Sequence, residues 1–262
     1  MFELLTNEDK EICTKVSNYD VDDLIEKTKK NYGAVFNAER IVLNNPLNKL
    51  GLQPLKCLLA FRINEARQNV RIHKYNVDLL SEYRKNGLLV INDLFTEKDV
   101  HGQTIKVNDR YINLVQMTLG DDTIPVYNTL TLQEMPAFRG DDLQCWSHVD
   151  TFHPVLKVWV YLDDVTLNHA PFCYAGGTHL WTEKKLQFMF DLSNKLTNIN
   201  EGDLRDINNG FPEPEPVCGT RFTTVFADVA GFHKRGNGKE GFVRRAAQGK
   251  NFRKNPFRNI NE

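Results

Sequence analysis

The pattern of hydrophobic and polar positions changes at about Gly87. Residues 1–80 are patterned as helices. In 20–30 the acidic residues come first and the basic ones last, before Gly33, an order that suits the helix dipole and a glycine C-cap. Residues 77–86 lie between a capping asparagine and Gly87, and they carry one apolar face that we expect to pack on a sheet.

Beyond Gly87, short runs of alternating or β-branched apolar residues predict strands. They are 88–92, 126–135, 155–162, 172–174, 221–229 and 242–248. One more helix is expected over 182–198, and the Pro-rich segment 211–216 is typical of a stiff, extended loop. The absence of a βαβ rhythm and of a Gly-rich phosphate loop argues against a dinucleotide-binding fold. We therefore predict an α+β fold: a double-stranded β-helix (jelly-roll or cupin-like) core with N-terminal and flanking helices.

Length and composition favour one globular domain. The chain has 262 residues, of which 41% are hydrophobic and 26% charged. Within a single domain 1–262 we expect a helical N-terminal segment 1–76 packed on the barrel, a double-stranded β-helix core 77–248 and a basic C-terminal tail 249–262. The basic residues from 234 onward are interpreted as a solvated surface, with the exception of Arg244.

Charge and cysteine usage exclude several classes of partner. The formal net charge of −1 gives no global field for nucleic acid or membrane, and no apolar run is long enough to span a bilayer. The N-terminus lacks a basic n-region and a long apolar stretch, so a cytoplasmic protein is expected. Five scattered cysteines without a Cys-x-x-Cys pair argue against a disulfide framework and a zinc ribbon, and favour reduced thiols. The oligomeric state does not follow from these patterns.

His148 and Asp150 are the first candidates for chemistry. They stand two residues apart before a strand, so their side chains share one face. An imidazole and a carboxylate in this arrangement are two thirds of the 2-His-1-carboxylate triad of non-haem Fe(II) enzymes. The third ligand must then be a downstream histidine, either His179 or His233. By itself a His-x-Asp pair is a weak pattern, because isolated histidines and aspartates are common at surfaces and turns.

Further motifs follow this pair in a fixed order. They are Leu162-Asp163-Asp164-Val165, Asn168-His169-Ala170-Pro171, Gly176-Gly177-Thr178-His179, the stretch 228–233 ending in His233, and Arg244, which stands eleven residues after His233. Over about 77–248 this series resembles the phytanoyl-CoA dioxygenase family of Fe(II)/2-oxoglutarate-dependent oxygenases. The chain departs from the family pattern at Ala170, Gly176 and Thr178, none of which is a ligand position.

The resemblance implies a role for each matching residue. His148, Asp150 and His233 would hold Fe(II) and leave three positions for 2-oxoglutarate and O₂. Arg244 would bind the distal carboxylate of 2-oxoglutarate, which suits a planar, two-pronged cation. Arg245 would point away, because side chains alternate along a strand.

Other residues are weaker candidates. Trp159 lies on the strand after the triad pair and is expected either as a wall of the cofactor pocket or as core packing. Gln133 is a candidate contact for 2-oxoglutarate, and His153 a candidate contact for substrate. His179 matches the structural histidine of the family's turn. The carboxylate of Asp150 favours hydroxylation over halogenation, since halogenating relatives have a small residue there.

These patterns lead to one principal hypothesis. The chain is expected to be an Fe(II)- and 2-oxoglutarate-dependent dioxygenase that hydroxylates an unactivated C–H bond of a small molecule and converts 2-oxoglutarate to succinate and CO₂. A jelly-roll binding protein without turnover and a cupin-type metal-dependent isomerase or hydrolase are the alternatives. The long insertion 182–220 is expected to form a lid or rim over the barrel mouth.

Overall fold

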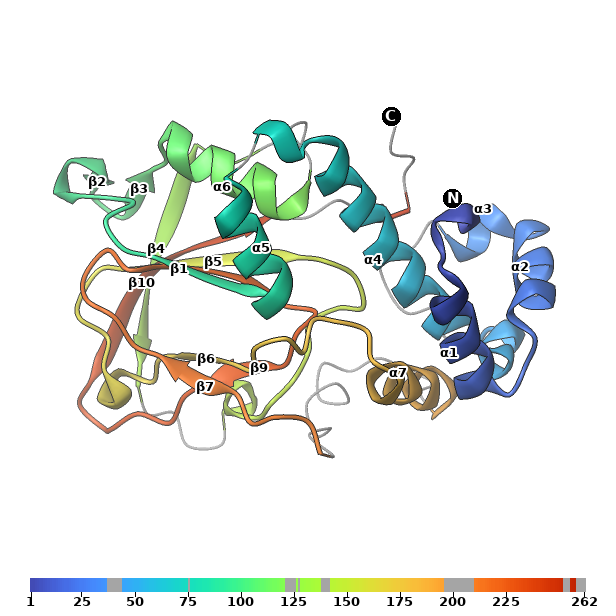
Figure 1. The fold of residues 1–262 in the computed structure, drawn as a ribbon. Coiled ribbons are helices and arrows are strands. Elements are labelled where there is room, and N and C mark those ends of the chain that lie inside the picture. Colours follow the sequence, from blue (N-terminus) through green and yellow to red (C-terminus); the bar gives the residue numbers. More distant parts are fainter. Residues whose placement is uncertain are drawn as a thin grey trace.

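An antiparallel sheet of seven strands lies at the centre of the described structure, in the order β1-β8-β5-β10-β4-β3-β2 (Figure 1). The computed structural model describes residues 1–36, 44–74, 76–120, 126, 128–137, 142–195, 210–251 and 255–257. The strands of this sheet are β1 (Leu88–Ile91), β8 (Thr224–Asp228), β5 (Leu156–Tyr161), β10 (Val243–Asn251), β4 (Thr129–Pro136), β3 (Thr104–Lys106) and β2 (Val100–His101). A second sheet has the order β7-β6-β9, formed by β7 (Glu215–Val217), β6 (Phe172–Tyr174) and β9 (His233–Arg235).

The two faces of the large sheet have different coverings. On one face Val158 and Val160 of β5 pack with the apolar sides of α5 (Val77–Asn86) and α6 (Asp109–Leu119). On the other face Trp159 and Tyr161 pack against Phe172 of the small sheet. The strand alternates between the two because successive side chains point to opposite faces. The result is the α+β double-stranded β-helix core with flanking helices that the sequence predicts.

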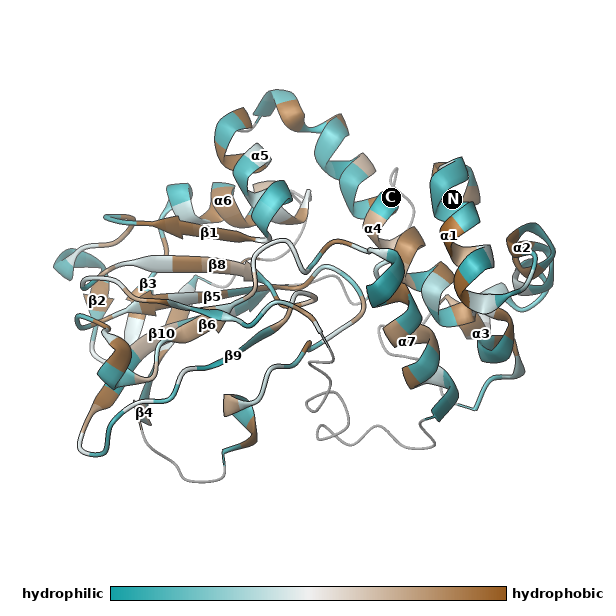
Figure 2. Cartoon of the chain, turned by 60° about the horizontal axis from the view of Figure 1, so that its bottom comes forward, coloured by the Kyte–Doolittle hydropathy of each residue, from teal (hydrophilic) through white to brown (hydrophobic). Residues whose placement is uncertain are grey.

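A separate helical cluster lies beside the sheets (Figure 1). Its helices are α1 (Asn7–Ser17), α2 (Val21–Lys29), α3 (Tyr32–Val35), α4 (Leu52–Val70) and α7 (Glu183–Lys195). They share a hydrophobic core that also takes in Phe152 and Phe257 from distant parts of the chain. Figure 2 shows a largely hydrophobic β1 in the sheet, whereas these helices mix hydrophilic and hydrophobic turns.

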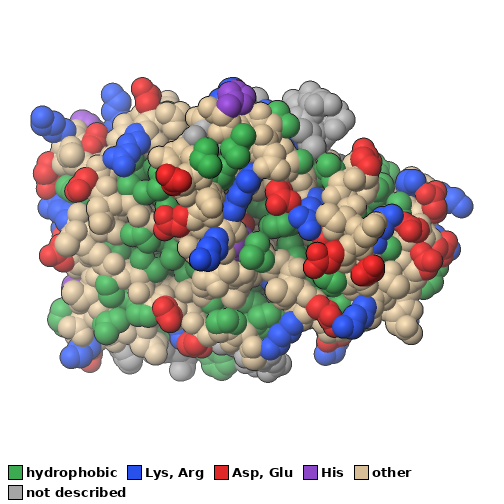
Figure 3. All heavy atoms as spheres, viewed as in Figure 1, with side chains coloured by type: hydrophobic (Ala, Val, Ile, Leu, Met, Phe, Trp, Pro, Cys, Tyr) green, Lys and Arg blue, Asp and Glu red, His purple; other side chains and the backbone are tan. Residues whose placement is uncertain are grey.

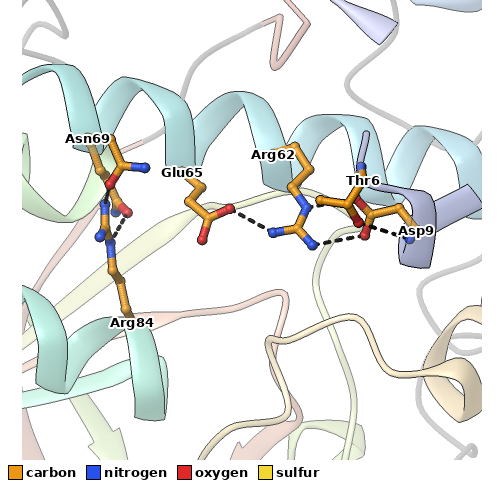
Figure 4. Close-up of polar contacts among 7 residues, drawn as sticks. Thr6, Asp9, Arg62, Glu65, Asn69 and Arg84 are labelled. Atoms are coloured by element: carbon orange, nitrogen blue, oxygen red, sulfur yellow. Dashed lines mark hydrogen bonds and ion pairs between the residues drawn. The ribbon is translucent and has the colours of Figure 1, made fainter. Parts of the chain in front are cut away.

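Helix α4 links the helical cluster to the barrel (Figure 4). In the middle of α4, Arg62 donates to both oxygens of Asp9, at 2.8 and 3.0 Å, and Asp9 also closes a capping box with Thr6 at the start of α1. Near the C-terminal end of α4, Asn69 accepts from Arg84 of α5 at 2.8 Å. Because Asp9 is buried, its bidentate ion pair contributes more than an exposed pair would.

The ends of α5 have the capping residues that the sequence predicts, whereas the C-terminal end of α2 does not. The side chain of Asn76 accepts from the backbone N–H of Leu79, and Gly87 ends α5 with a φ of 69°. Both features are as predicted. The prediction of a glycine cap at Gly33 is wrong: α2 ends at Lys29, its C-cap residue Lys30 has a right-handed conformation, and Gly33 lies inside α3.

Three further features of the sheet region were not predicted from the sequence. Helix α6 and the β2–β3 hairpin were not expected, and β10 continues to Asn251, beyond the predicted end of its strand. The end of the Pro-rich segment also forms part of β7, where Pro216 pairs with Cys173.

The surface carries interspersed charges of both signs on the face drawn in Figure 3, in agreement with a net charge close to zero. Among the described helices, none combines the length and apolar character that crossing a membrane requires.

Gly87 is predicted to be irreplaceable for steric as well as conformational reasons. A Cβ there would lie 2.4 Å from both His179 Nδ1 and Tyr174 Oη, two buried side chains. Gly102 provides a matched control, since it also has a positive φ but meets nothing within 4 Å. Gly102→Ala should lower the free energy of unfolding by about 1–2 kcal/mol. Gly87→Ala should cost about 1–3 kcal/mol more from overpacking. Denaturant unfolding measures both, and equal losses would contradict the close packing at Gly87.

Candidate metal centre and buried arginine

A backbone bridge brings the two candidate histidines together. The N–H of His148 donates to the carbonyl of His233 at 3.0 Å, and the N–H of His233 donates back at 2.9 Å. His148 precedes β5 of the large sheet, whereas His233 begins β9 of the small sheet. Directly opposed residues of an antiparallel pair project to the same side, and the two imidazole rings lie 4.4 Å apart.

Asp150 completes a three-residue cluster. Its backbone N–H donates to the carbonyl of Val229 at 2.9 Å, which places the carboxylate beside the rings. Its Oδ1 lies 3.7 Å from Nε2 of His148 and 3.7 Å from Nε2 of His233. One ligand atom from each residue lies within 4.8 Å of the other two, which is close enough for all three to bind one metal ion.

Hydrogen bonds at the far side of each ring fix its tautomer. Nδ1 of His148 lies 2.7 Å from the carbonyl of Trp146, and Nδ1 of His233 lies 2.9 Å from that of Gly231. A carbonyl only accepts, so each Nδ1 carries the proton. Each Nε2 therefore presents its lone pair toward the cluster, as a metal-binding imidazole requires.

The ionisation states also suit a metal. Burial lowers the pKa of His233 to about 3, although the charge of Asp150 opposes this shift. Burial raises the pKa of Asp150, but the charges of His233 and Lys157 and the hydrogen bond from Lys157 outweigh it, so that pKa falls below its usual value. At neutral pH the cluster thus presents a neutral imidazole and a carboxylate, which are the forms that bind divalent metals.

The turn before His233 is held by neighbouring side chains. Thr178 Oγ1 accepts from the N–H of Phe232 at 2.8 Å, so the threonine that departs from the family pattern retains a functional hydroxyl. The buried Lys185 of α7 donates to the carbonyls of Ala230, at 2.7 Å, and Thr178. These contacts fix the start of β9 from the helical side.

Arg244 is a buried cation between the two sheets. Its side chain is 5% exposed, and Nη1 donates to the carbonyl of Ala170 at 2.6 Å. Its Nε has no hydrogen-bond partner, and among the described residues Arg244 forms no ion pair. Arg245 points the other way and pairs with both oxygens of Asp163, at 2.6 and 2.5 Å. Burying an arginine without a carboxylate is costly, so this position favours an anionic ligand.

A second arginine was missed in the sequence analysis. Arg235 was grouped with the solvated basic residues, but it is largely buried and pairs with Asp142. Its Nη2 lies 3.3 Å from Sδ of Met135, and Nη2 of Arg244 lies 3.8 Å from the same sulfur. The interpretation of Arg235 as part of a solvated surface is therefore wrong. Its position two residues after His233 on a strand could have indicated this, because the two side chains share a face.

Lys157 was also missed, although it contacts Asp150 directly. Its ammonium forms an ion pair with Asp150 Oδ2. The sequence offered an indication: Lys157 shares the inner face of a buried strand with Trp159 and Tyr161. A lysine in such a position requires a partner.

The remaining candidates lie at different distances from this centre. Trp159 stacks on Phe172 at 4.1 Å, and Phe172 lies 5.7 Å from the ring of His233. Gln133 of β4 is exposed and stands opposite Ala246, so it shares the face of Arg244. His153 is buried against Phe152 in an edge contact, with Nδ1 3.3 Å from the carbonyl of Pro154.

The other histidine considered as a ligand has a structural position. Nε2 of His179 lies 3.1 Å from the carbonyl of Arg84 near the end of α5. Burial lowers its pKa to about 4, with a smaller contribution from Lys185. His179 therefore connects the glycine turn to α5 and lies outside the three-residue metal cluster.

The insertion expected as a lid is only partly described. Its first part is α7, which packs on α1 and α4 through Leu186, Met189 and Leu192. This helix is thus a fixed wall of the helical cluster. Residues 196–209 of the insertion lie outside the described residues. The last part of the insertion contains β7, which pairs with β6 in the small sheet.

No protein-family model matches the chain, and no curated protein matches it in sequence. Solved structures similar to it include EctD from S. alaskensis with 2-oxoglutarate and 5-hydroxyectoine, at 15% identity and a TM-score of 0.46 over 70% of this chain and 79% of that one. The epimerase SnoN in complex with Fe³⁺, alpha ketoglutarate and nogalamycin RO has 11% identity and a TM-score of 0.46 over 67% and 82%. EvdMO1 has 14% identity and a TM-score of 0.44 over 67% of this chain, which spans about half (49%) of EvdMO1. Because these values are low, functional assignment depends on the chain's own residues.

Proposed function

We propose that this protein is an Fe(II)- and 2-oxoglutarate-dependent dioxygenase that hydroxylates an unactivated C–H bond of a small-molecule substrate. The proposal rests on a buried His-Asp-His cluster that shares the space between the sheets with a buried arginine lacking an ion pair among the described residues. Two imidazoles and one carboxylate on one face fit non-haem Fe(II) and leave three positions for other ligands. When bound, Fe(II) with 2-oxoglutarate supplies the oxidation of substrate by O₂.

The chain's own residues perform the binding and positioning. His148, Asp150 and His233 are the proposed metal ligands, each oriented by a backbone contact. Arg244 is the proposed partner of the distal carboxylate of 2-oxoglutarate, because its unpaired Nε leaves donor capacity in a confined site. The Trp159–Phe172 stack closes the side near His233 and excludes water there.

Two of the weaker candidates keep proposed roles. Gln133 shares the face of Arg244 at its exposed edge and is the proposed second polar contact of the co-substrate. His153 is buried against Phe152 and remains a proposed substrate contact.

The alternatives have different requirements. A binding protein without turnover would not need the metal-ready tautomers of both histidines. A cupin-type isomerase or hydrolase would not need the buried Arg244. Both alternatives predict the absence of 2-oxoglutarate-dependent succinate release.

The triad is tested by His148→Ala. The backbone bridge to His233 uses only main-chain atoms, so the fold should survive while a metal ligand is lost. Fe(II) affinity should fall by more than about 100-fold, since loss of an outer-shell partner alone costs 10–100-fold. Succinate formation should disappear with it. Anaerobic Fe(II) titration and a succinate assay measure both effects.

His101→Ala is the control, because this histidine is exposed on β2. It should match the unaltered protein in both assays. Full turnover by His148→Ala would place the metal elsewhere.

The proposed role of Arg244 is tested by substitutions at this position, with a substitution of Arg245 as the control. Arg244→Ala should weaken 2-oxoglutarate binding by about 2–5 kcal/mol, the usual cost of removing one partner of a confined charge pair. Arg244→Lys should lose less, because the charge remains while the planar fork is lost. Metal binding should persist in both. Titration of anaerobic Fe(II) protein with 2-oxoglutarate gives these affinities.

Arg245→Ala serves as the matched control, because Arg245 faces Asp163 on the outside. It should leave 2-oxoglutarate binding unchanged. If all three variants bind 2-oxoglutarate with unchanged affinity, the role proposed for Arg244 is wrong.

A further inference from the structure

Lys157 is a charged residue in an apolar layer. On β5 it alternates with Leu156 and Val158, which pack under the helices, and shares the inner face with Trp159 and Tyr161. Its side chain is 20% exposed. A lysine so placed is stable only when its ammonium has a partner, since burying an unpaired charge is costly. The partner on this face is the carboxylate of Asp150.

The two oxygens of that carboxylate have separate neighbours. Oδ1 lies 3.7 Å from Nε2 of each histidine, on the side where the metal cluster forms. Oδ2 is held by the ammonium of Lys157. A metal ion and an ammonium repel each other, so they are accommodated best on different oxygens of one carboxylate.

The number of carboxylate oxygens bound to the metal matters for chemistry. Carboxylates bind metals through either one or both oxygens. With two histidines and one carboxylate oxygen, three of six positions stay open, which 2-oxoglutarate and O₂ together need. A second carboxylate oxygen would occupy one of them.

We propose that Lys157 is a positioning residue that restricts Asp150 to one-oxygen coordination and so keeps a metal position open for the co-substrate. This inference rests on the proposed metal site. It assigns Lys157 no contact with substrate. It requires only that Oδ2 remain paired with the ammonium when Oδ1 binds metal.

The direct test uses Co(II) as the probe, without 2-oxoglutarate. Crystal structures and visible absorption spectra are compared for the unaltered protein, Lys157→Met, Lys157→Arg and Lys106→Met. The last is the control, because Lys106 is an exposed lysine on a strand of the same sheet. In Lys157→Met, both Asp150 oxygens should lie within about 2.0–2.3 Å of the metal and the spectrum should change. The other two variants should match the unaltered protein.

The second readout is co-substrate affinity. Lys157→Met should bind Co(II) at least as tightly as the unaltered protein, because a nearby cation is gone. Its Kd for 2-oxoglutarate should rise about 10- to 100-fold, and Lys157→Arg should restore it. Lys157→Gln, which removes the charge but keeps a hydrogen-bond donor, is measured in parallel. If Lys157→Met does not fold, Lys157→Gln provides the test of the role of Lys157.

The outcomes separate this inference from the proposed function. If the unaltered protein binds neither Co(II) nor 2-oxoglutarate, the proposed function fails. If it binds both and the uncharged variants keep one-oxygen coordination with an unchanged spectrum, the role of Lys157 is wrong. Weaker Co(II) binding without a change in coordination would also overturn it, because Lys157 would then only support the fold.

Discussion

The candidate site depends on the pair of backbone hydrogen bonds between His148 and His233. One histidine belongs to the approach to the large sheet and the other to the small sheet, so these bonds join the two layers where the chemistry is proposed. Each such bond contributes only about 0.5–1.5 kcal/mol net. Their geometry persists because the apolar layer around Trp159, Phe172 and Val225 keeps the sheets in contact. Packing thus supplies the stability, and the hydrogen bonds supply the register that makes the imidazoles face each other.

The helical cluster supports both sides of this bridge without contributing a ligand. Phe152, two residues after Asp150, is buried in the helical core with Lys56 of α4 over its ring at 5.0 Å. On the other side, Lys185 of α7 holds the turn that leads to His233. The N-terminal helices therefore have a structural reason to accompany the barrel. A change in their packing would be transmitted to the loops that position the metal cluster.

Charge gives the space between the sheets its preference for an anion. Arg244, Arg235 and Lys157 lie there with only two carboxylates, Asp142 and Asp150, among the described residues with which they pair. A divalent metal would add two more positive charges. A dianion such as 2-oxoglutarate would offset most of that excess, which gives a physical reason why the co-substrate and metal would bind together.

The sequence by itself determined the local features. A capping asparagine and a glycine defined α5, a run of β-branched and aromatic residues identified β5, and the spacing of His148 and Asp150 placed both on one side of the chain. Helix α6 also has a capping Asn108 and a Gly120 after its last residue, so local signals mark its ends as well. Only the tertiary structure decided which distant groups meet. The burial of Arg235 against Asp142 and the place of α7 in the helical core each join segments whose proximity no local pattern encodes. Side-chain periodicity fixes the face on which a residue lies, whereas the packing of layers fixes what that face meets.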